Sequence, residues 1–291
     1  MEQKFTFKIN RNTTCFNVID FLANIDKNKS LELTIDIDCI GFINSENYVI
    51  ISSYINEMKE NGIDVAIIVN KKNCNTLNYA SRIDFFKSLG VDFEENFRRH
   101  DTSGNLIPIT KIDPNVYDIS QDILDVFKND FKLEDADIDQ LSFIMGEMVC
   151  NATIHSKSKS GAYLYCQKYK QIDELEFILI DSGIGVKESL IKNEKFVSLS
   201  NQEALIKALE YEVTNGEGRG HGLFFASEFV RRNNGSMVLI SGENHLVINN
   251  ETITTGTNSY WNGVFLKFKF KFDPKISIYD LMDEANYELT N

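Results

Sequence analysis

The first hundred residues alternate between strand patterns and helix patterns. Apolar side chains at every second position predict strands over residues 4–10 and 31–38, and an all-apolar run at 65–69 is typical of a strand buried on both faces. Helical spacing of apolar residues follows each strand, over residues 14–24, 44–59 and 75–88. The order strand, helix, strand, helix predicts a small α/β domain spanning residues 1–103.

After a turn-forming triplet at residues 103–105 the pattern starts again. Helices are predicted over 117–130, from 134 onward, over 203–211 and over 223–232. Strands are predicted over 106–112, 161–169, 174–180, 236–241, 245–249 and 264–272. We therefore expect a second α/β domain at residues 104–275 and an acidic tail at 276–291.

Composition narrows the class of protein. The 291 residues are 43% hydrophobic and 25% charged, which is ordinary for a globular chain with two modest domains. A formal net charge of −13 argues against nucleic-acid or anionic-membrane binding, because a polyanion would be repelled. The chain has neither a secretion signal at its start nor an apolar run long enough to span a membrane, so we expect a cytoplasmic protein with no membrane contact.

The five cysteines are odd in number, scattered, and never in C-x-x-C spacing. This pattern predicts reduced, mostly buried thiols with neither a zinc site nor a disulfide framework.

Glycine occupies every second position from Gly216 to Gly222, in the run NGEGRGHGL at residues 215–223. Glycine has no Cβ and tolerates positive φ, so such a run can turn several N–H groups toward one anion, and a following helix would add its positive N-terminal end. The run is neither a P-loop nor a dinucleotide-binding fingerprint. It indicates a phosphate-bearing ligand held in another way.

Two further motifs precede this run. Glu147 and Asn151 lie four residues apart on one predicted helix and so share a face, where an amide oxygen could ligate Mg²⁺ and a carboxylate could orient a water molecule. Asp181 ends a predicted strand and is followed by Gly183 and Gly185, an arrangement in which a carboxylate can accept from an exocyclic amine while a base lies against bare backbone. Each motif alone is common, whereas the ordered set of motifs is much less so.

The ordered set resembles the GHKL (Bergerat-fold) ATPases, over about residues 106–272. The resemblance implies a two-layer α/β sandwich with a mixed sheet that binds ATP and Mg²⁺. It implies that Glu147 activates or orients the nucleophile, that Asn151 ligates Mg²⁺ through the ATP phosphates, and that Asp181 binds the adenine amino group. It further implies a mobile lid at residues 186–215, and Val264 stands where the family often has an adenine-contacting threonine. The implied base and phosphate contacts are Gly183, Gly185, Gly218, Arg219, Gly220, His221, Gly222 and Leu223.

The N-terminal pattern, including LTIDIDCIGFINS at residues 33–45, resembles STAS domains of the anti-anti-sigma type over about residues 4–98. That family implies a phosphorylatable serine at the start of a helix, and Ser45 occupies this position, although Asn44 stands where Asp is usual. The alternative is that Asn44 or Ser45 only caps the helix.

Three functions follow as hypotheses. The protein is an ATPase switch, a serine/threonine kinase of the anti-sigma type acting on a STAS-like partner, or a nucleotide-binding module that does not hydrolyse ATP. We expect a protein partner or self-association besides ATP. His155, four residues after Asn151, either braces the helix end or takes part in catalysis.

Overall fold

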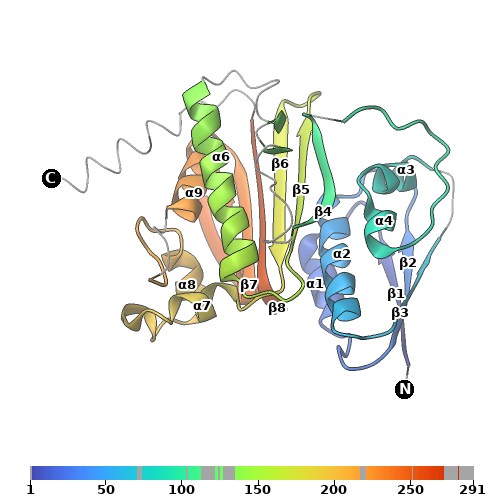
Figure 1. The fold of residues 1–291 in the computed structure, drawn as a ribbon, viewed down its shortest axis with the longest axis horizontal. Coiled ribbons are helices and arrows are strands. Elements are labelled where there is room, and N and C mark those ends of the chain that lie inside the picture. Colours follow the sequence, from blue (N-terminus) through green and yellow to red (C-terminus); the bar gives the residue numbers. More distant parts are fainter. Residues whose placement is uncertain are drawn as a thin grey trace.

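The computed structural model describes most of the chain as two sheets with flanking helices (Figure 1). The predicted helix at 117–130 lies almost wholly outside the described residues, as do most of the acidic tail and the side chains of residues 135–137, 139–141 and 143. The described residues are 2–70, 74–102, 104–112, 122–123, 125–126, 135–216, 221–250, 252–271 and 281.

The N-terminal unit is built on a parallel sheet of three strands in the order β1-β2-β3. Its strands are β1 (Gln3–Ile9), β2 (Leu31–Ile37) and β3 (Val65–Val69), and its helices are α1 (Cys15–Leu22), α2 (Ser45–Glu60), α3 (Asn75–Arg82) and α4 (Phe85–Leu89). The predicted strand and helix order is confirmed for this unit. The single helix predicted over 75–88 is interrupted instead, because Asp84 adopts a left-handed conformation with φ of 62°.

The expectation that the strand at 65–69 is buried on both faces is wrong. β3 lies at the edge of its sheet, Ala66 is exposed, and Ile68 keeps 49% of its surface exposed. An all-apolar run therefore does not by itself distinguish an edge strand with one exposed face from a central strand.

The second sheet has five strands in the order β4-β5-β6-β8-β7. They are β4 (Leu106–Ile112), β5 (Ala162–Tyr169), β6 (Glu174–Asp181), β7 (Ser236–Asn249) and β8 (Thr252–Lys271). Every neighbouring pair among these described strands is antiparallel, so the expected mixed sheet is wrong for this part of the chain. Connectivity accounts for two of these four pairs, because β5–β6 and β7–β8 are hairpins and a hairpin can only join antiparallel strands.

The strands predicted separately at 236–241 and 245–249 form one continuous strand, β7. It bends at register irregularities between Ile240 and Asn244. Its partner β8 begins at Thr252, well before the predicted start at residue 264. The early part of β8 could not be predicted, because the polar, threonine-rich sequence at 252–259 has no apolar alternation.

Helices cover one face of the five-stranded sheet. These are α6 (Asp135–Cys150) with the π-helical turn Asn151–His155, and α9 (Gly222–Arg232), which lie together on the left of the sheet in Figure 1. Two short helices, α7 (Gly185–Leu190) and α8 (Asn201–Lys207), follow β6. Leu175, Phe177 and Leu179 of β6 belong to the hydrophobic core on this face.

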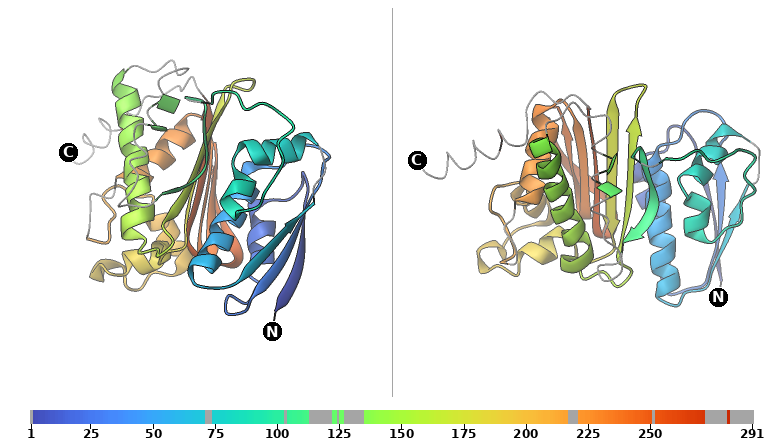
Figure 2. Two further views of the ribbon diagram at one scale, coloured as in Figure 1. Left: turned by 45° about the vertical axis from the view of Figure 1, so that its right-hand side comes forward. Right: turned by 45° about the horizontal axis from the view of Figure 1, so that its top comes forward.

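The N-terminal unit covers the opposite face of the same sheet (Figure 2). Ile178 and Ile180 of β6 point to this side, and they share one hydrophobic core with Tyr48 of α2 and Phe85 of α4. The five-stranded sheet is thus buried on both faces, and the two sequence patterns pack as adjoining layers. The boundary at residue 103 stays a prediction.

A buried polar cluster joins the two layers. Ser45, the first residue of α2, donates its hydroxyl to the carboxylate of Glu176 on β6, and Lys267 of β8 pairs with Glu46 of α2. Burial alone would raise the pKa of Glu176, but Lys267, a second lysine and the hydroxyl donors hold this pKa below its usual value. The position before α2, Asn44, makes no side-chain capping bond. Ser45 therefore serves as a contact between layers, which differs from the expected cap.

The expectation of reduced thiols throughout is wrong for one pair of cysteines. Cys39 and Cys74 form a disulfide across 35 residues of sequence, whereas Cys15, Cys150 and Cys166 are free. The sequence could not show this pair, because only the fold brings the end of β2 beside the start of α3.

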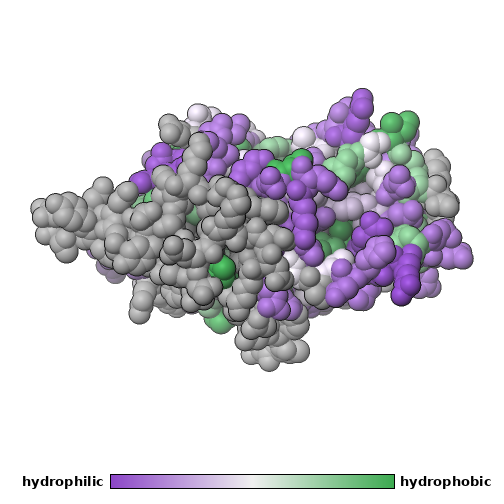
Figure 3. Space-filling model, turned by 90° about the horizontal axis from the view of Figure 1, so that it is seen from above, coloured by the Kyte–Doolittle hydropathy of each residue, from purple (hydrophilic) through white to green (hydrophobic). Residues whose placement is uncertain are grey.

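The surface seen from above is mostly hydrophilic over the described residues, with small separate apolar patches (Figure 3). In the part of the chain that the structure describes, no helix has both the length and the apolar composition that crossing a membrane requires.

Candidate functional site

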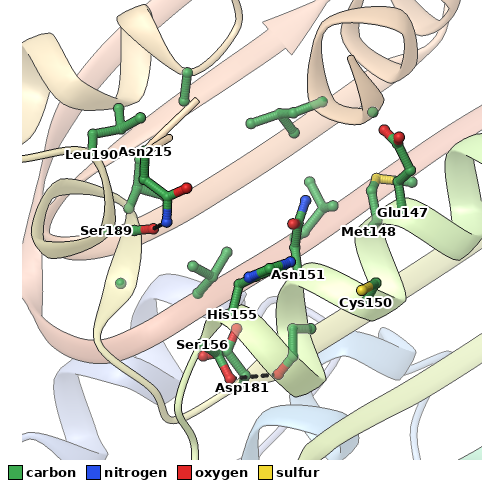
Figure 4. A pocket seen from close by; sticks show the side chains of 18 of the residues that line it. Glu147, Met148, Cys150, Asn151, His155, Ser156, Asp181, Ser189, Leu190 and Asn215 are labelled. Carbon is green, nitrogen blue, oxygen red and sulfur yellow. Dashed lines mark hydrogen bonds between the residues drawn. The ribbon is translucent and has the colours of Figure 1, made fainter. Parts of the chain in front are cut away.

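One cavity of about 330 Å³ lies on the helix-covered face of the five-stranded sheet (Figure 4). Its size falls in the range of about 300–1,000 Å³ that is usual for small-molecule sites. Its walls come from the end of α6, the π-helical turn, the end of β6, interior positions of β7 and β8, the segment from α7 to residue 215, and the start of α9.

Most of the site residues expected from the sequence line this cavity. The structure brings together Glu147, Asn151, Asp181, Gly185, His221, Gly222 and Leu223. Gly183 lies next to Asp181 but is not part of the lining. Gly218, Arg219 and Gly220 lie outside the described residues.

Glu147 and Gly222 meet where α6 passes the start of α9. A Cβ atom added to Gly222 would lie 2.9 Å from Oε2 of Glu147 and 3.0 Å from its Cβ. A side chain at position 222 would therefore displace Glu147, so glycine lets the start of α9 lie close to this glutamate without moving it. The carboxylate of Glu147 is thereby placed beside Gly222, the first residue of an 11-residue helix.

Asn151 stands where α6 changes from α-helical to π-helical hydrogen bonding. Its carbonyl accepts from the N–H of Ser156, five residues on, and its own side chain is exposed and lines the cavity. Single π-helical turns occur frequently at functional sites because they redirect side chains from the regular helix face. His155 ends this turn, also lines the cavity, and lies beside Asn151 in Figure 4.

Asp181 is the last residue of β6 and is only 2% exposed. Its Oδ1 accepts a hydrogen bond from the N–H of Gly183 at 2.8 Å, and the backbone N–H of Val264 also donates to the carboxylate. Burial nevertheless dominates and raises the pKa of Asp181 to about 7, because the charged form loses its hydration. A buried carboxyl group with a strongly raised pKa that lines a cavity is typical of ligand sites.

Two glycines allow the close packing around Asp181. A Cβ on Gly183 would lie 2.1 Å from the carbonyl oxygen of Ser156, and a Cβ on Gly263 would lie 2.2 Å from that of Asp181. Gly263 also has a φ of 95°. Side chains at these positions would push the end of β6 away from the π-helical turn or from β8.

The segment between β6 and α9 forms the opposite wall of the cavity. Asn215 donates from Nδ2 to Oγ of Ser189 at 3.1 Å, which ties the end of the segment to α7 (Figure 4). The ring of Tyr211 stacks on His221 with centroids 4.7 Å apart and planes 4° apart. The helix predicted at 203–211 is shorter and earlier, as α8, and the sequence also missed α7.

Ser241 is a further residue of this site that the sequence did not indicate. Its hydroxyl accepts from the N–H of Val186 at 3.0 Å and donates to the carbonyl of Gly263 at 2.8 Å, so it joins α7 to β8. Serine within a strand gives no signal for such a role. It could be found only once β7 and α7 are known to be neighbours.

The charged side chains among the described lining residues are Glu147 and Asp181, and neither lysine nor arginine is present in this described part of the lining. The described residues also contain no group of three or more His, Cys, Asp or Glu side chains that could hold a metal ion. A phosphate-bearing ligand would therefore depend on backbone N–H groups, on the N-terminus of α9, and on a cation that enters with the ligand.

No model of a known protein family matches the chain, and no curated protein is detectably similar to it.

Proposed function

We propose that this protein binds Mg·ATP in the cavity on the helix-covered face of the five-stranded sheet and hydrolyses it as a nucleotide-controlled switch. The observation that carries the proposal is the convergence of three motifs that are far apart in sequence. Glu147 with Asn151, Asp181, and Gly222 with Leu223 line one cavity. This convergence supports assigning residues 106–272 to the GHKL type, although the antiparallel order of the described strands differs from the sheet expected of that type.

The base end of the proposed site is at Asp181. Its buried carboxyl group offers an acceptor to the exocyclic amine of adenine, and apolar side chains surround the rest of a flat ring. These are Leu179, Ile184, Val186, Val264 and Leu266. Val264 presents methyl groups where the resembling family often has a threonine hydroxyl, so Asp181 carries more of the base recognition here.

The phosphate end of the proposed site is at Asn151 and the start of α9. The N-terminus of α9 offers N–H groups to anionic oxygens at Gly222 and Leu223. Asn151 would hold Mg²⁺ through its amide oxygen, since Mg²⁺ prefers oxygen ligands and takes the remainder from phosphates and water. Bound Mg²⁺ would supply neutralisation of the phosphate charge, which the described lining side chains do not provide. The cavity residues fit this ion.

Glu147 is the proposed group that orients or deprotonates the attacking water. It is the only described carboxylate of the lining besides Asp181, and it lies beside the N-terminus of α9, where we place the phosphates. A module that only binds nucleotide would have no need of a carboxylate at this point, so the residue favours hydrolysis over simple binding.

Hydrolysis is also favoured over phosphorylation of the chain's own Ser45. The Ser45 side chain is 1% exposed and bonded to Glu176, on the face of the sheet opposite to the cavity. A phosphate in the cavity could reach it only after the N-terminal layer had left the sheet. In the observed arrangement, kinase activity therefore requires a serine or threonine other than Ser45.

Incubation with γ-labelled Mg·ATP tests the proposal directly. We expect label to leave as inorganic phosphate, at a rate that Glu147→Gln lowers strongly and that Ser45→Ala leaves unchanged. Label that accumulates on protein would establish the kinase alternative. Bound but intact ATP would indicate a binding module.

A further inference from the structure

Strands β7 and β8 extend beyond the five-stranded sheet as a two-stranded hairpin. β6 pairs with β8 only from Val264 onward, whereas β7 and β8 remain paired as far as the contact of Asn249 with Thr252. We name residues 242–250 and 252–262 the hairpin arm. Register irregularities on both sides of Gly242 mark the point where the arm leaves the sheet, and such bulges bend a strand and change its direction.

The root of the arm is bonded to the cavity wall. Ser241, directly before the arm, accepts the N–H of Val186 at the start of α7. Asn262, at the end of the arm, donates from Nδ2 to the carbonyl of Ser182 at 2.7 Å. Both bonds hold backbone within five residues of Asp181, and Val186 itself lines the cavity.

Helix α8 packs against the arm. Gln202 of α8 donates from Nε2 to Oγ1 of Thr255 at 2.8 Å. A Cβ on Gly242 would lie 3.2 Å from Nδ2 of Asn201, so α8 begins against the arm. Ala208, which directly follows α8, lines the cavity. Movement of the arm would thus move one wall of the cavity.

The same arm contacts α1 of the N-terminal unit. The ring of His245 lies over Phe16 with centroids 4.5 Å apart, and the N–H of Ser259 donates to Oδ1 of Asp20 at 3.3 Å. The absence of a side chain at Gly256 makes room for the His245 ring, because a Cβ there would lie 2.6 Å from it. In Figure 1, α8 and α1 lie on either side of the ends of β7 and β8.

We infer that the hairpin arm couples the N-terminal unit to the cavity, and that His245 and Gln202 are positioning residues for the ligand held there. Contact with α1 fixes the arm, and the arm fixes α7 and α8. An event at α1, such as the binding of a protein partner, then changes nucleotide affinity, and nucleotide binding changes the stability of the α1 contact by the same factor. The expected change in nucleotide affinity rests on the proposed nucleotide site, whereas the link from α1 through the arm to α7 and α8 does not.

The link is tested first without nucleotide, by hydrogen exchange. His245→Ala removes the ring contact with α1 and the contact of its Nδ1 with Oδ1 of Asn258 inside the arm, and we expect faster amide exchange in α8. His245→Phe keeps a ring over Phe16 and is expected to restore the slower exchange. If His245→Ala leaves exchange in α8 unchanged, the inference fails whether or not the protein binds ATP.

The functional half is tested by a double-mutant cycle on Mg·ATP affinity. We expect His245→Ala and Gln202→Ala each to weaken binding by about 2- to 30-fold, and the double variant to be less impaired than the product of the two effects. His245→Phe should bind like the parent protein. If the parent protein binds Mg·ATP, two results would refute the coupling without refuting the nucleotide site. One is that the two substitutions act independently on the affinity, and the other is that His245→Ala does not change it. A parent protein that binds no nucleotide would refute the proposed function instead.

Discussion

Replacing Asp181 with asparagine is expected to stabilise the protein at neutral and alkaline pH while impairing ligand binding. Asparagine has nearly the same shape and keeps an oxygen to accept the N–H of Gly183. It removes the charge that burial at the end of β6 disfavours. The substitution therefore separates what the folded protein needs at this position from what the ligand needs.

The size of the effect follows from the pKa of Asp181. Folding raises this pKa from an ordinary value of 3.8 to about 7, so between these values the folded protein binds more protons than the unfolded chain. The contribution of Asp181 to stability consequently falls as pH rises from about 4 to 7. Each pH unit in that window corresponds to about 1.4 kcal/mol, so the ionised group costs folding up to about 4 kcal/mol above pH 7.

Urea unfolding of the parent protein and of Asp181→Asn at pH 4.5 and at pH 8 measures this contribution. We expect similar free energies of unfolding at the lower pH and a higher value for Asp181→Asn at pH 8, by up to about 4 kcal/mol. The change with pH identifies the cause, since a simple packing change would shift both values equally. Equal differences at the two pH values would refute the reasoning that burial of this carboxylate is costly.

Three further outcomes are expected. Glu147→Gln should lower the rate of ATP hydrolysis by at least about 100-fold with little change in nucleotide affinity, measured by phosphate release and by calorimetry. Lys267→Met should lower the free energy of unfolding by about 3–5 kcal/mol, because it removes the cation that pairs with both Glu46 and Glu176 and leaves Glu176 with Lys269 alone, and adding Glu176→Gln should recover part of the loss in urea titrations. Titration of thiols in the unfolded, unreduced protein should find three free thiols, because Cys39 and Cys74 are joined in the disulfide, and a count of five would contradict it. Reduction of this disulfide should lower the free energy of unfolding by about 3–4 kcal/mol.

Local pattern was sufficient to predict most of the helices and strands, because alternation and helical spacing record which face of each element is buried. It was not sufficient for elements whose burial is set by a distant neighbour. The apolar run at 177–180 is buried on both faces because the N-terminal unit packs behind β6, whereas a similar run in β3 has an exposed face. Nothing within either run distinguishes the two cases.

In the candidate site, too, local sequence pattern predicted some residues and not those whose role depends on distant neighbours. The motif residues were found because their spacing and order carry a chemical meaning, and the cavity contains those that the structure describes, apart from Gly183 and Gly216. Ser241 and the hairpin arm were not found, because a serine and a threonine-rich strand have no distinctive pattern. Their importance comes from contacts with α7 and α8, and such contacts between distant segments cannot be inferred from one sequence.

The central claim, that the cavity takes Mg·ATP, is tested most directly by titration calorimetry on the whole chain. We expect saturable binding of ATP with one site per chain, strongly weakened by removal of Mg²⁺ with EDTA and by Asn151→Ala. Asp181→Asn should weaken it as well, although that variant is the more stable protein at pH 8. Absence of binding by the parent protein, or binding that all three changes leave untouched, would contradict the account.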